Sequence, residues 1–279
     1  MGEMRLFGGL VGLAATLVSS SALGNPAQLP EGARYVAMGS SFAAGPGVGP
    51  NTPDTPQRCG RGTFNYPNLV AEQLKLKLVD ATCSGAKTEH VLGPWNEVAP
   101  QIDSVDADTR LVTVTIGGND IAFVGNIFAA FCEKAEKPEP RCRPWSAPAE
   151  TDWQADEKRM REIVRGIKSR APKARVVFVD YITVLPAKAG CAEVPMSAER
   201  LAYSQGVAKR LAAMTAQVAR EEGAEVLRFS KLSKNHAPCS KAPWSNGVNA
   251  PAGDGIPVHP NKLGHQAAAD ALVKFLTRR

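Results

Sequence analysis

Aromatic residues and histidines are scarce in this chain of 279 residues. Phenylalanine, tryptophan and tyrosine together make up 6% of the sequence, and the four histidines are scattered along it. A protein that binds nucleic acid would be expected to show a stripe of basic residues with aromatic side chains between them. The formal net charge is +6, but the excess lysine and arginine is dispersed along the chain. We therefore expect no nucleic-acid partner.

The sequence also lacks a Cys-x-x-Cys pair, so cysteine and histidine do not occur at the close spacing of a zinc site. We expect neither a metal nor a cofactor. Six cysteines are present nonetheless, and in an exported protein they indicate three disulfides. Spacing alone does not choose among the pairings. The sequential one is the simplest: Cys59–Cys83, Cys132–Cys142 and Cys191–Cys239.

The longest apolar run lies at the N-terminus. Residues 6–18 form an apolar stretch after Arg5, and small residues follow as far as Gly24. The run is shorter than the roughly 20 residues that span a bilayer, and the pattern is typical of a signal peptide over residues 1–24. We therefore expect a secreted protein cleaved near Gly24. A membrane anchor or a buried helix is the alternative interpretation.

Beyond residue 24, short apolar runs alternate with amphipathic stretches, without an internal repeat or a low-complexity linker. This alternation predicts an α/β fold, in which helices cover both faces of a parallel sheet. The expected strands are residues 34–38, 76–81, 110–116, 174–181 and 224–229. The expected helices are residues 66–74, 121–131, 152–170, 197–222 and 262–277. Ser197 and Asn261 are suited to cap the last two, and Gly223 to end the longest.

Two proline-rich segments, residues 45–63 and 134–148, do not fit any regular element. Long irregular loops in compact domains often serve as lids or binding loops. Both segments contain cysteines, so disulfides would hold them in place.

Four polar clusters stand out, and two of them directly follow expected strands. They are Gly39-Ser40-Ser41, Ser84-Gly85-Ala86, Gly117-Gly118-Asn119-Asp120 and His259-Pro260-Asn261. In an open α/β sheet, ligands bind beyond the carboxyl ends of the strands. A serine, an asparagine beside glycines and a late histidine placed there supply a nucleophile, an oxyanion donor and a base. This combination predicts serine-dependent ester hydrolysis.

Each cluster also has a simpler interpretation. Ser41 could belong to an ordinary serine-rich turn, and its surroundings are not the Gly-x-Ser-x-Gly of α/β-hydrolases. Gly85 could be a turn glycine, and Asn119 could cap the following helix. His259 is held between prolines, and a near-neutral pKa suits it to exchange a proton. The other histidines, His90, His236 and His265, are not framed in this way.

Taken together, the four clusters resemble those of the SGNH hydrolases, also called the GDSL esterase/lipase family. The resemblance runs from about residue 34 to the C-terminus. It implies a flavodoxin-like three-layer α/β/α sandwich with a central parallel five-stranded sheet, formed as one catalytic domain over residues 25–279. It implies Ser41 as nucleophile, His259 as base, and an oxyanion hole of Ser41, Gly85 and Asn119. The signal peptide and six cysteines are most similar to the secreted actinobacterial branch, whose members carry three sequential disulfides.

The sequence departs from the family pattern at two positions. The first block normally reads Gly-Asp-Ser, whereas Ser40 replaces the aspartate here. The acid that normally lies three residues before the histidine is replaced by Ile256, and the nearest carboxylate is Asp254. Asp254 could complete a triad through a looped backbone. Alternatively, the backbone carbonyl of Ile256 could orient His259 in a Ser–His dyad.

We therefore expect a secreted esterase or lipase that cleaves fatty acyl esters, including those of phospholipids, through an acyl-enzyme. Aromatic side chains near the blocks, Phe42, Phe123 and Phe128, are candidates for an acyl site or for ordinary core. A carbohydrate O-deacetylase and a non-catalytic lipid- or glycan-binding protein are the alternatives. We expect a monomer with at most transient contact with lipid surfaces. If the pKa of His259 is unperturbed, activity should fall below about pH 6.5.

Overall fold

The computed structural model describes residues 1–3, 29–53, 55–135 and 142–278. The expected signal peptide and its cleavage point lie almost entirely outside these residues. No helix in the described part of the chain is both long and apolar enough to cross a membrane.

A five-stranded parallel sheet forms the centre of the molecule, in the order β2-β1-β3-β4-β5. This is the order of the flavodoxin-like fold. The strands are β1 (Arg34–Gly39), β2 (Lys77–Asp80), β3 (Thr109–Thr115), β4 (Arg175–Val179) and β5 (Glu225–Leu227). The three inner strands are buried along almost their whole length, because helices cover both faces. The expected fold and all five strands are confirmed.

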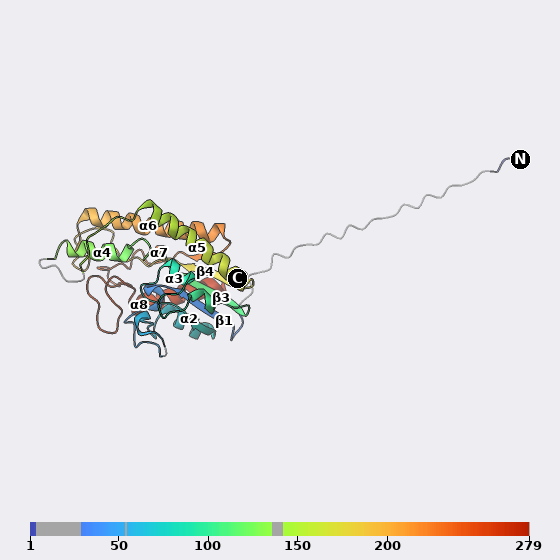
Figure 1. The fold of residues 1–279 in the computed structure, drawn as a ribbon, viewed down its shortest axis with the longest axis horizontal. Coiled ribbons are helices and arrows are strands. Elements are labelled where there is room, and N and C mark those ends of the chain that lie inside the picture. Colours follow the sequence, from blue (N-terminus) through green and yellow to red (C-terminus); the bar gives the residue numbers. More distant parts are fainter. Residues whose placement is uncertain (4–28, 54, 136–141, 279) are drawn as a thin grey trace.

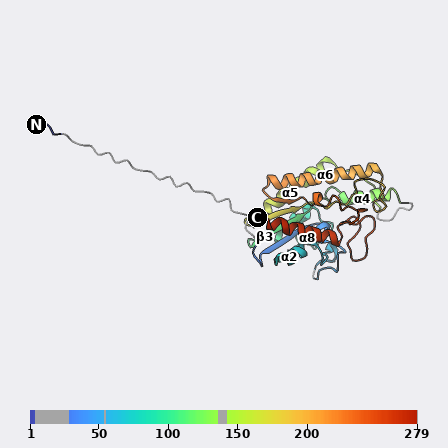
Figure 2. The same cartoon turned by 180° about the vertical axis from the view of Figure 1, so that it is seen from behind.

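Helices pack on the two faces of the sheet, as Figures 1 and 2 show from opposite sides. One layer contains α2 and α8, which contact each other, and the other contains the long pair α5 and α6 together with α3 and α4. The helices are α1 (Ser41–Ala44), α2 (Tyr66–Leu74), α3 (Thr88–Leu92), α4 (Phe123–Cys132), α5 (Glu150–Arg170), α6 (Ala198–Glu221), α7 (Phe229–Leu232) and α8 (Lys262–Thr277), with short 3₁₀ turns η1 (Gln57–Cys59) and η2 (Gln101–Ser104).

The expected helix ends are confirmed where capping residues mark them. The side chain of Ser197 accepts from the backbone N–H of Arg200 at the start of α6, and that of Asn261 accepts from Gly264 N–H at the start of α8. Gly223, which follows the end of α6, adopts a φ of 63°. These contacts satisfy N–H groups that have no partner inside the helix.

Three expected strands are longer in the sequence prediction than in the structure: residues 76–81 exceed β2 by one residue at each end, and the other two differ mainly at their carboxyl ends. β4 ends at Val179, and the carboxylate of Asp180 then accepts from the backbone N–H and the hydroxyl of Ser230. β5 ends at Leu227, because the chain turns into α7 at Phe229. The apolar character of these segments comes from burial in the loops beyond the sheet.

The sequential pairing of the cysteines is confirmed, with disulfides Cys59–Cys83, Cys132–Cys142 and Cys191–Cys239. The first joins the long loop after α1 to the segment that follows β2. That loop also contacts the segment before His259, since Gly255 N–H donates to Gly47 O at 2.9 Å and Val48 forms a bridge with Asp254. The irregular loop is therefore held to two segments of the expected site, the one that follows β2 and the one that precedes His259.

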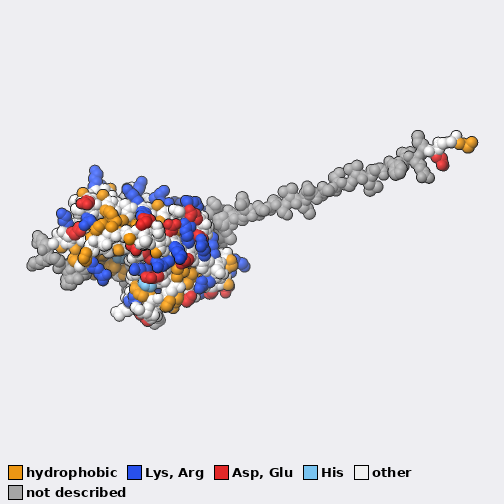
Figure 3. Space-filling view, turned by 45° about the horizontal axis from the view of Figure 1, so that its top comes forward, with side chains coloured by type: hydrophobic (Ala, Val, Ile, Leu, Met, Phe, Trp, Pro, Cys, Tyr) orange, Lys and Arg blue, Asp and Glu red, His pale blue; other side chains and the backbone are white. Residues whose placement is uncertain are grey.

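Basic and acidic side chains are interspersed on the face drawn in Figure 3. Charged side chains also pair between α5 and the end of α6, where Arg161 and Arg165 contact Glu222. The dispersal of charge expected from the sequence is therefore visible on this face.

Candidate active site

Ser41 lies directly beyond the carboxyl end of β1, as the first residue of α1. The turn before it is held by Gln101, which accepts from Gly39 N–H at 2.7 Å and donates to Gly39 O at 3.0 Å. Gly39 adopts a φ of 137°, a conformation that an L side chain rarely adopts, and its Cα faces the backbone of Thr115 without room for a Cβ. The glycine before the two serines is thus required by the backbone path.

Ser41 and His259 are hydrogen-bonded although 218 residues separate them. The distance from Ser41 Oγ to His259 Nε2 is 2.8 Å, and the two residues are 8% and 6% exposed. The ring of Phe42 packs against the imidazole, with 4.8 Å between ring centres. A backbone hydrogen bond holds the loop that carries the histidine, since Asn246 N–H donates to His259 O at 2.9 Å. A hydroxyl bonded to an imidazole nitrogen is the arrangement of an activated nucleophile and its base.

The imidazole is oriented by a backbone carbonyl. His259 Nδ1 lies 2.7 Å from the carbonyl oxygen of Pro257. A carbonyl oxygen can only accept, so Nδ1 carries the proton and Nε2 of the neutral ring presents its lone pair to the Ser41 hydroxyl.

Neither of the two partners expected from the sequence occupies this position. A carboxylate oxygen of Asp254 accepts instead from the backbone N–H of Lys262 at 2.7 Å. The carbonyl of Ile256 faces the side-chain amide of Asn246 at 3.4 Å. The backbone kinks at Val258, where φ is 59°, and this turn brings the carbonyl of Pro257 rather than that of Ile256 against the ring.

Burial lowers the pKa of His259 to about 4, against the smaller raising effect of the Pro257 carbonyl. The condition for a loss of activity below about pH 6.5, an unperturbed pKa, is therefore not met, because charging the ring in this buried position is costly. The imidazole is neutral, and available as a base, throughout the range from weakly acidic to alkaline pH.

The second and third clusters are joined to each other and to the turn of Ser41. Cys83 N–H donates to Gly39 O at 3.0 Å, and Asn119 Nδ2 donates to Ala86 O at 2.9 Å. The carboxylate of Asp120 accepts from the N–H of Thr88 at 3.0 Å. Asn119 is not a helix cap, because α4 begins only after Ala122. The asparagine side chain instead ties the loop after β3 to the loop after β2.

Three N–H groups in these clusters have donor capacity left. The backbone N–H groups of Ser41 and Gly85 donate to no acceptor among residues that the structure describes. Asn119 Nδ2 has two hydrogens and uses one of them on Ala86. Gly85 is exposed and has a φ of 83°, and a Cβ there would lie 3.2 Å from the ring of Trp95.

Tyr181 is a site residue that the sequence reasoning missed. Its hydroxyl accepts from Gly118 N–H at 2.9 Å and lies 3.4 Å from Ser40 Oγ, and its ring packs on Phe42 with 4.7 Å between centres. A Cβ on Gly118 would lie 2.8 Å from this hydroxyl. In the sequence, Tyr181 stands at the end of an expected strand. Its position just past the carboxyl end of β4, where site residues gather in such sheets, is the signal that could have identified it.

The other histidines each have partners of their own. His90 and His236 stack on tryptophan rings, and His265 accepts from Tyr66 N–H. The three aromatic candidates line separate cavities: Phe42 one of about 10 Å³, Phe123 one of about 670 Å³ and Phe128 one of about 290 Å³. Within the described residues there is no group of three or more His, Cys, Asp or Glu side chains able to hold a metal ion.

A parallel sheet in the flavodoxin-like order, with a hydrogen-bonded serine and histidine beyond its strands, defines a serine-hydrolase type of α/β protein. The chain belongs to the GDSL-like Lipase/Acylhydrolase family, which it matches over residues 37–267. It is a carboxylic ester hydrolase. Membership of this family leaves no support for the non-catalytic alternative.

Its relatives include two bacterial lipases. Lipase 2 of Streptomyces coelicolor is 33% identical over 277 residues, which cover 95% of this chain and 92% of the relative. A lipase of Streptomyces rimosus is 31% identical, with 78% of this chain and 77% of the relative covered.

The same fold occurs in solved structures. The crystal structure of the extracellular lipase of S. rimosus superposes with a TM-score of 0.68 at 28% identity, covering 86% of this chain and 97% of the lipase. Phospholipase A1 of Streptomyces albidoflavus also gives a TM-score of 0.68, at 22% identity, covering 88% of this chain and all of that enzyme. The similarity to this phospholipase shows a shared fold alone.

Proposed function

We propose that this protein is a lipase or esterase that hydrolyses fatty acyl esters through an acyl-enzyme on Ser41. The observation that carries the proposal is the 2.8 Å contact between Ser41 Oγ and His259 Nε2. The 2.7 Å contact of Nδ1 with Pro257 O supports it, because this contact leaves Nε2 as the acceptor. Together they support a dyad of serine and histidine, with a carbonyl in the place of the usual acid.

The proposed reaction has two halves. Ser41 Oγ attacks the ester carbonyl while His259 Nε2 takes its proton, and the N–H groups of Ser41, Gly85 and Asn119 receive the tetrahedral oxyanion. His259 then returns the proton to the departing alcohol, which leaves the acyl group on Ser41. In the second half His259 takes a proton from water and the resulting hydroxyl attacks the acyl carbonyl. The bond from this carbon to Ser41 Oγ then breaks, His259 returns the proton to Ser41 Oγ, and the acid is released.

A lipid ester is the favoured substrate because the two relatives above 30% identity are both lipases. The carbohydrate O-deacetylase alternative has weaker support. An acetylxylan esterase of Geobacillus stearothermophilus superposes with a TM-score of 0.51 at 16% identity, which indicates a shared fold alone.

A series of p-nitrophenyl esters from acetate to palmitate tests both the nucleophile and the acyl preference. We expect Ser41→Ala to lose at least about 10³-fold in kcat. Ser40→Ala is the matched control, because it removes the neighbouring hydroxyl and should keep most activity. Residual turnover by Ser41→Ala equal to that of Ser40→Ala would reject Ser41 as nucleophile. A strict preference for acetate would favour the deacetylase.

Asp254→Asn distinguishes a dyad from a triad. In a triad, replacing the acid by its amide costs about 10⁴-fold in kcat. Here the Asp254 carboxylate caps Lys262 N–H, a bond that an asparagine oxygen can still accept, so we expect kcat to stay within about threefold of wild type. A loss of the triad size would show that Asp254 reaches His259 during turnover.

We also propose that the protein is secreted, with cleavage near Gly24, and that residues 25–279 form one catalytic domain. Three disulfides and the extracellular S. rimosus lipase support secretion. N-terminal sequencing of the protein from a culture supernatant checks the cleavage site. Recovery of an uncleaved chain from the membrane fraction would favour the anchor.

We further propose a monomer that touches lipid surfaces only transiently. Phe64 and Leu263 are 48% and 58% exposed, and the Lys262 ammonium lies 5.4 Å from the centre of the Phe64 ring, which supports weak contact with an anionic lipid surface. Sedimentation with and without anionic vesicles should show a free monomer and a minor bound fraction. Complete co-sedimentation at physiological salt would contradict transient contact.

A further inference from the structure

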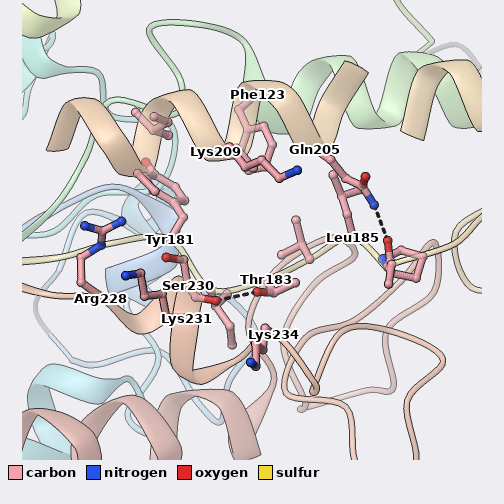
Figure 4. Close-up of a pocket in the computed structure, with 17 residues that line it drawn as sticks. Phe123, Tyr181, Thr183, Leu185, Gln205, Lys209, Arg228, Ser230, Lys231 and Lys234 are labelled. Carbon is pink, nitrogen blue, oxygen red and sulfur yellow. Dashed lines mark hydrogen bonds between the residues drawn. The ribbon is translucent and has the colours of Figure 1, made fainter. Parts of the chain in front are cut away.

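A large cavity lies between the segment that follows β4 and the helices α6 and α7 (Figure 4). Its volume is about 670 Å³, within the range of about 300–1,000 Å³ in which small-molecule sites fall. Neither Ser41 nor His259 lines it. Apolar side chains of three elements make its walls, namely Phe123, Val184, Leu185, Ala208, Leu211 and Ala212.

The charged residues that line this cavity are all basic. They are Lys209 on α6, Arg228 before α7, and Lys231 and Lys234 on the opposite side of the opening in Figure 4. None of its described lining residues is an aspartate or a glutamate. Arg228 is already paired with Asp180 at 3.3 Å, whereas none of the three lysines has a carboxylate within 4.0 Å in the part of the chain that the structure describes. The cavity thus combines apolar walls with uncompensated positive charge.

We propose that this cavity binds a fatty carboxylate, with the alkyl chain against the apolar walls and the carboxylate among Lys209, Lys231 and Lys234. Apolar walls gain affinity with each methylene group of a ligand, by about fourfold for one that is fully buried. Three free ammonium groups favour an anionic head over a neutral or cationic one. The lining hydroxyls of Thr183 and Ser230 already donate to Ser230 O and to the Asp180 carboxylate, so the three ammonium groups are the donors proposed for the ligand carboxylate (Figure 4).

This site is distinct from the reaction centre but lies beside it. Tyr181 lines the cavity, and its ring packs on Phe42, which in turn packs on His259. The proposal does not depend on the role of Ser41, because none of the reacting groups contributes to the cavity. A lipase that releases fatty acids would be exposed to this ligand at each turnover.

Isothermal titration of the Ser41→Ala protein with decanoate, below its micellar concentration, tests the proposal. Decanol and decylammonium are the neutral and cationic probes of the same chain length. We expect decanoate to bind at least tenfold more tightly than either, and added salt to weaken it. No binding of decanoate, or equal binding of the three probes, would overturn the proposal.

Two variants place the ligand in this cavity. Lys231→Glu with Lys234→Glu should weaken decanoate at least tenfold, and Ala208→Phe, which fills the apolar part, at least fivefold. Lys173→Glu with Lys241→Glu makes the same change of charge at exposed lysines outside the cavity and should stay within twofold. Decanoate affinity that neither cavity variant alters would reject this site, whatever the activity of the protein.

Esterase assays on the same variants, built with Ser41 present, separate the two proposals. Hydrolysis of p-nitrophenyl acetate should stay within twofold in the cavity variants, since they leave the Ser41–His259 pair in place. Loss of decanoate binding with activity intact supports a separate site. Equal loss of both would show that decanoate occupies the reaction centre, and would overturn the inference without touching the function proposed for Ser41.

Discussion

At the scale of single residues, the site is built around a histidine that no carboxylate of the described residues touches. A carbonyl oxygen fixes the tautomer of His259 as well as an acid would, since it can only accept from Nδ1. It carries only a partial charge, so it stabilises the imidazolium less than an aspartate does. Burial therefore dominates the pKa of the ring, which falls to about 4.

The acid limb of the pH profile should follow this lowered pKa. Protonation of Nε2 removes the acceptor for the Ser41 hydroxyl, so kcat/KM should hold its plateau to about pH 5 and halve near pH 4. The measurement is the pH dependence of kcat/KM for a neutral ester. Circular dichroism at pH 4 and full recovery at pH 7 separate this loss from unfolding. A midpoint near 6.5 would show that the free enzyme holds His259 in contact with solvent.

Tyr181 should act as a positioning residue for the loop that carries Asn119. Tyr181→Phe keeps the ring against Phe42 and removes the acceptor of the buried Gly118 N–H, which costs about 1–3 kcal/mol. The loop can relieve this cost by shifting its backbone, which displaces the Asn119 donor from the oxyanion. We expect kcat to fall at least about tenfold with KM nearly unchanged.

Tyr35→Phe is the matched control for this prediction. It also removes one buried hydroxyl, which is bonded to Thr113 at 2.7 Å, but it lies within the sheet. The two variants should lose similar thermal stability, and only Tyr181→Phe should lose kcat. A parallel loss of kcat in both would make the role of Tyr181 merely structural.

Some features of the site could be predicted from short stretches of sequence, and others could not. Ser41, Gly85, Asn119 and His259 could be proposed from the sequence because each stands in a short polar cluster. The contact with Pro257 could not, because it depends on a positive φ at the next residue, which no side chain there announces. A single turn of backbone thus decides which carbonyl orients the base.

At the scale of elements, the long helices and inner strands could be predicted because their burial pattern repeats over many residues. The short helices α1, α3 and α7 were missed, since four or five residues carry too little periodicity. Each of them begins just beyond the sheet, where tertiary contacts decide the backbone. In α3, for example, the first N–H is bound by Asp120 from another loop.

The Cys59–Cys83 disulfide should support both stability and activity. It joins the loop after α1 to the residue before Ser84, and Cys83 N–H binds Gly39 O beside the nucleophile. Replacing both cysteines by serine should lower the free energy of unfolding by about 3 kcal/mol. It should also lower kcat, because the loop of Gly85 loses its anchor. Urea unfolding and ester hydrolysis measure the two effects.

The Cys132–Cys142 disulfide provides the comparison, since it closes a shorter segment at the end of α4. Its double serine variant should also lose stability, by a somewhat smaller amount because the closed loop is shorter. Its kcat should remain near wild type. If both variants lost the same fraction of kcat, the effect would be a general loosening and not one transmitted through Gly85.

At the scale of the whole molecule, the interior holds a carboxyl group without a hydrogen-bond partner. Asp156 on α5 is 0% exposed, and neither carboxyl oxygen has a partner among the described residues. Burial, reinforced by the nearby Asp120, raises its pKa to about 9. The folded protein therefore keeps Asp156 neutral at pH 7, whereas the unfolded chain releases this proton near its ordinary value of 3.8.

Asp156→Asn should therefore stabilise the protein increasingly as pH rises. Between about pH 4 and pH 9 Asp156 holds one proton in the folded state that it releases in the unfolded state, so its contribution to stability is fully present below this range and falls with rising pH. The limit is about 1.4 kcal/mol per pH unit. Asparagine resembles the neutral acid in shape and removes this dependence, so the difference in Tm between variant and wild type should grow from pH 5 to pH 8.

Asp180→Asn is the contrasting control, because Asp180 is bonded to Ser230 and paired with Arg228. That variant should lower Tm at both pH values. A constant difference between Asp156→Asn and wild type would mean that Asp156 is already ionised in the folded protein.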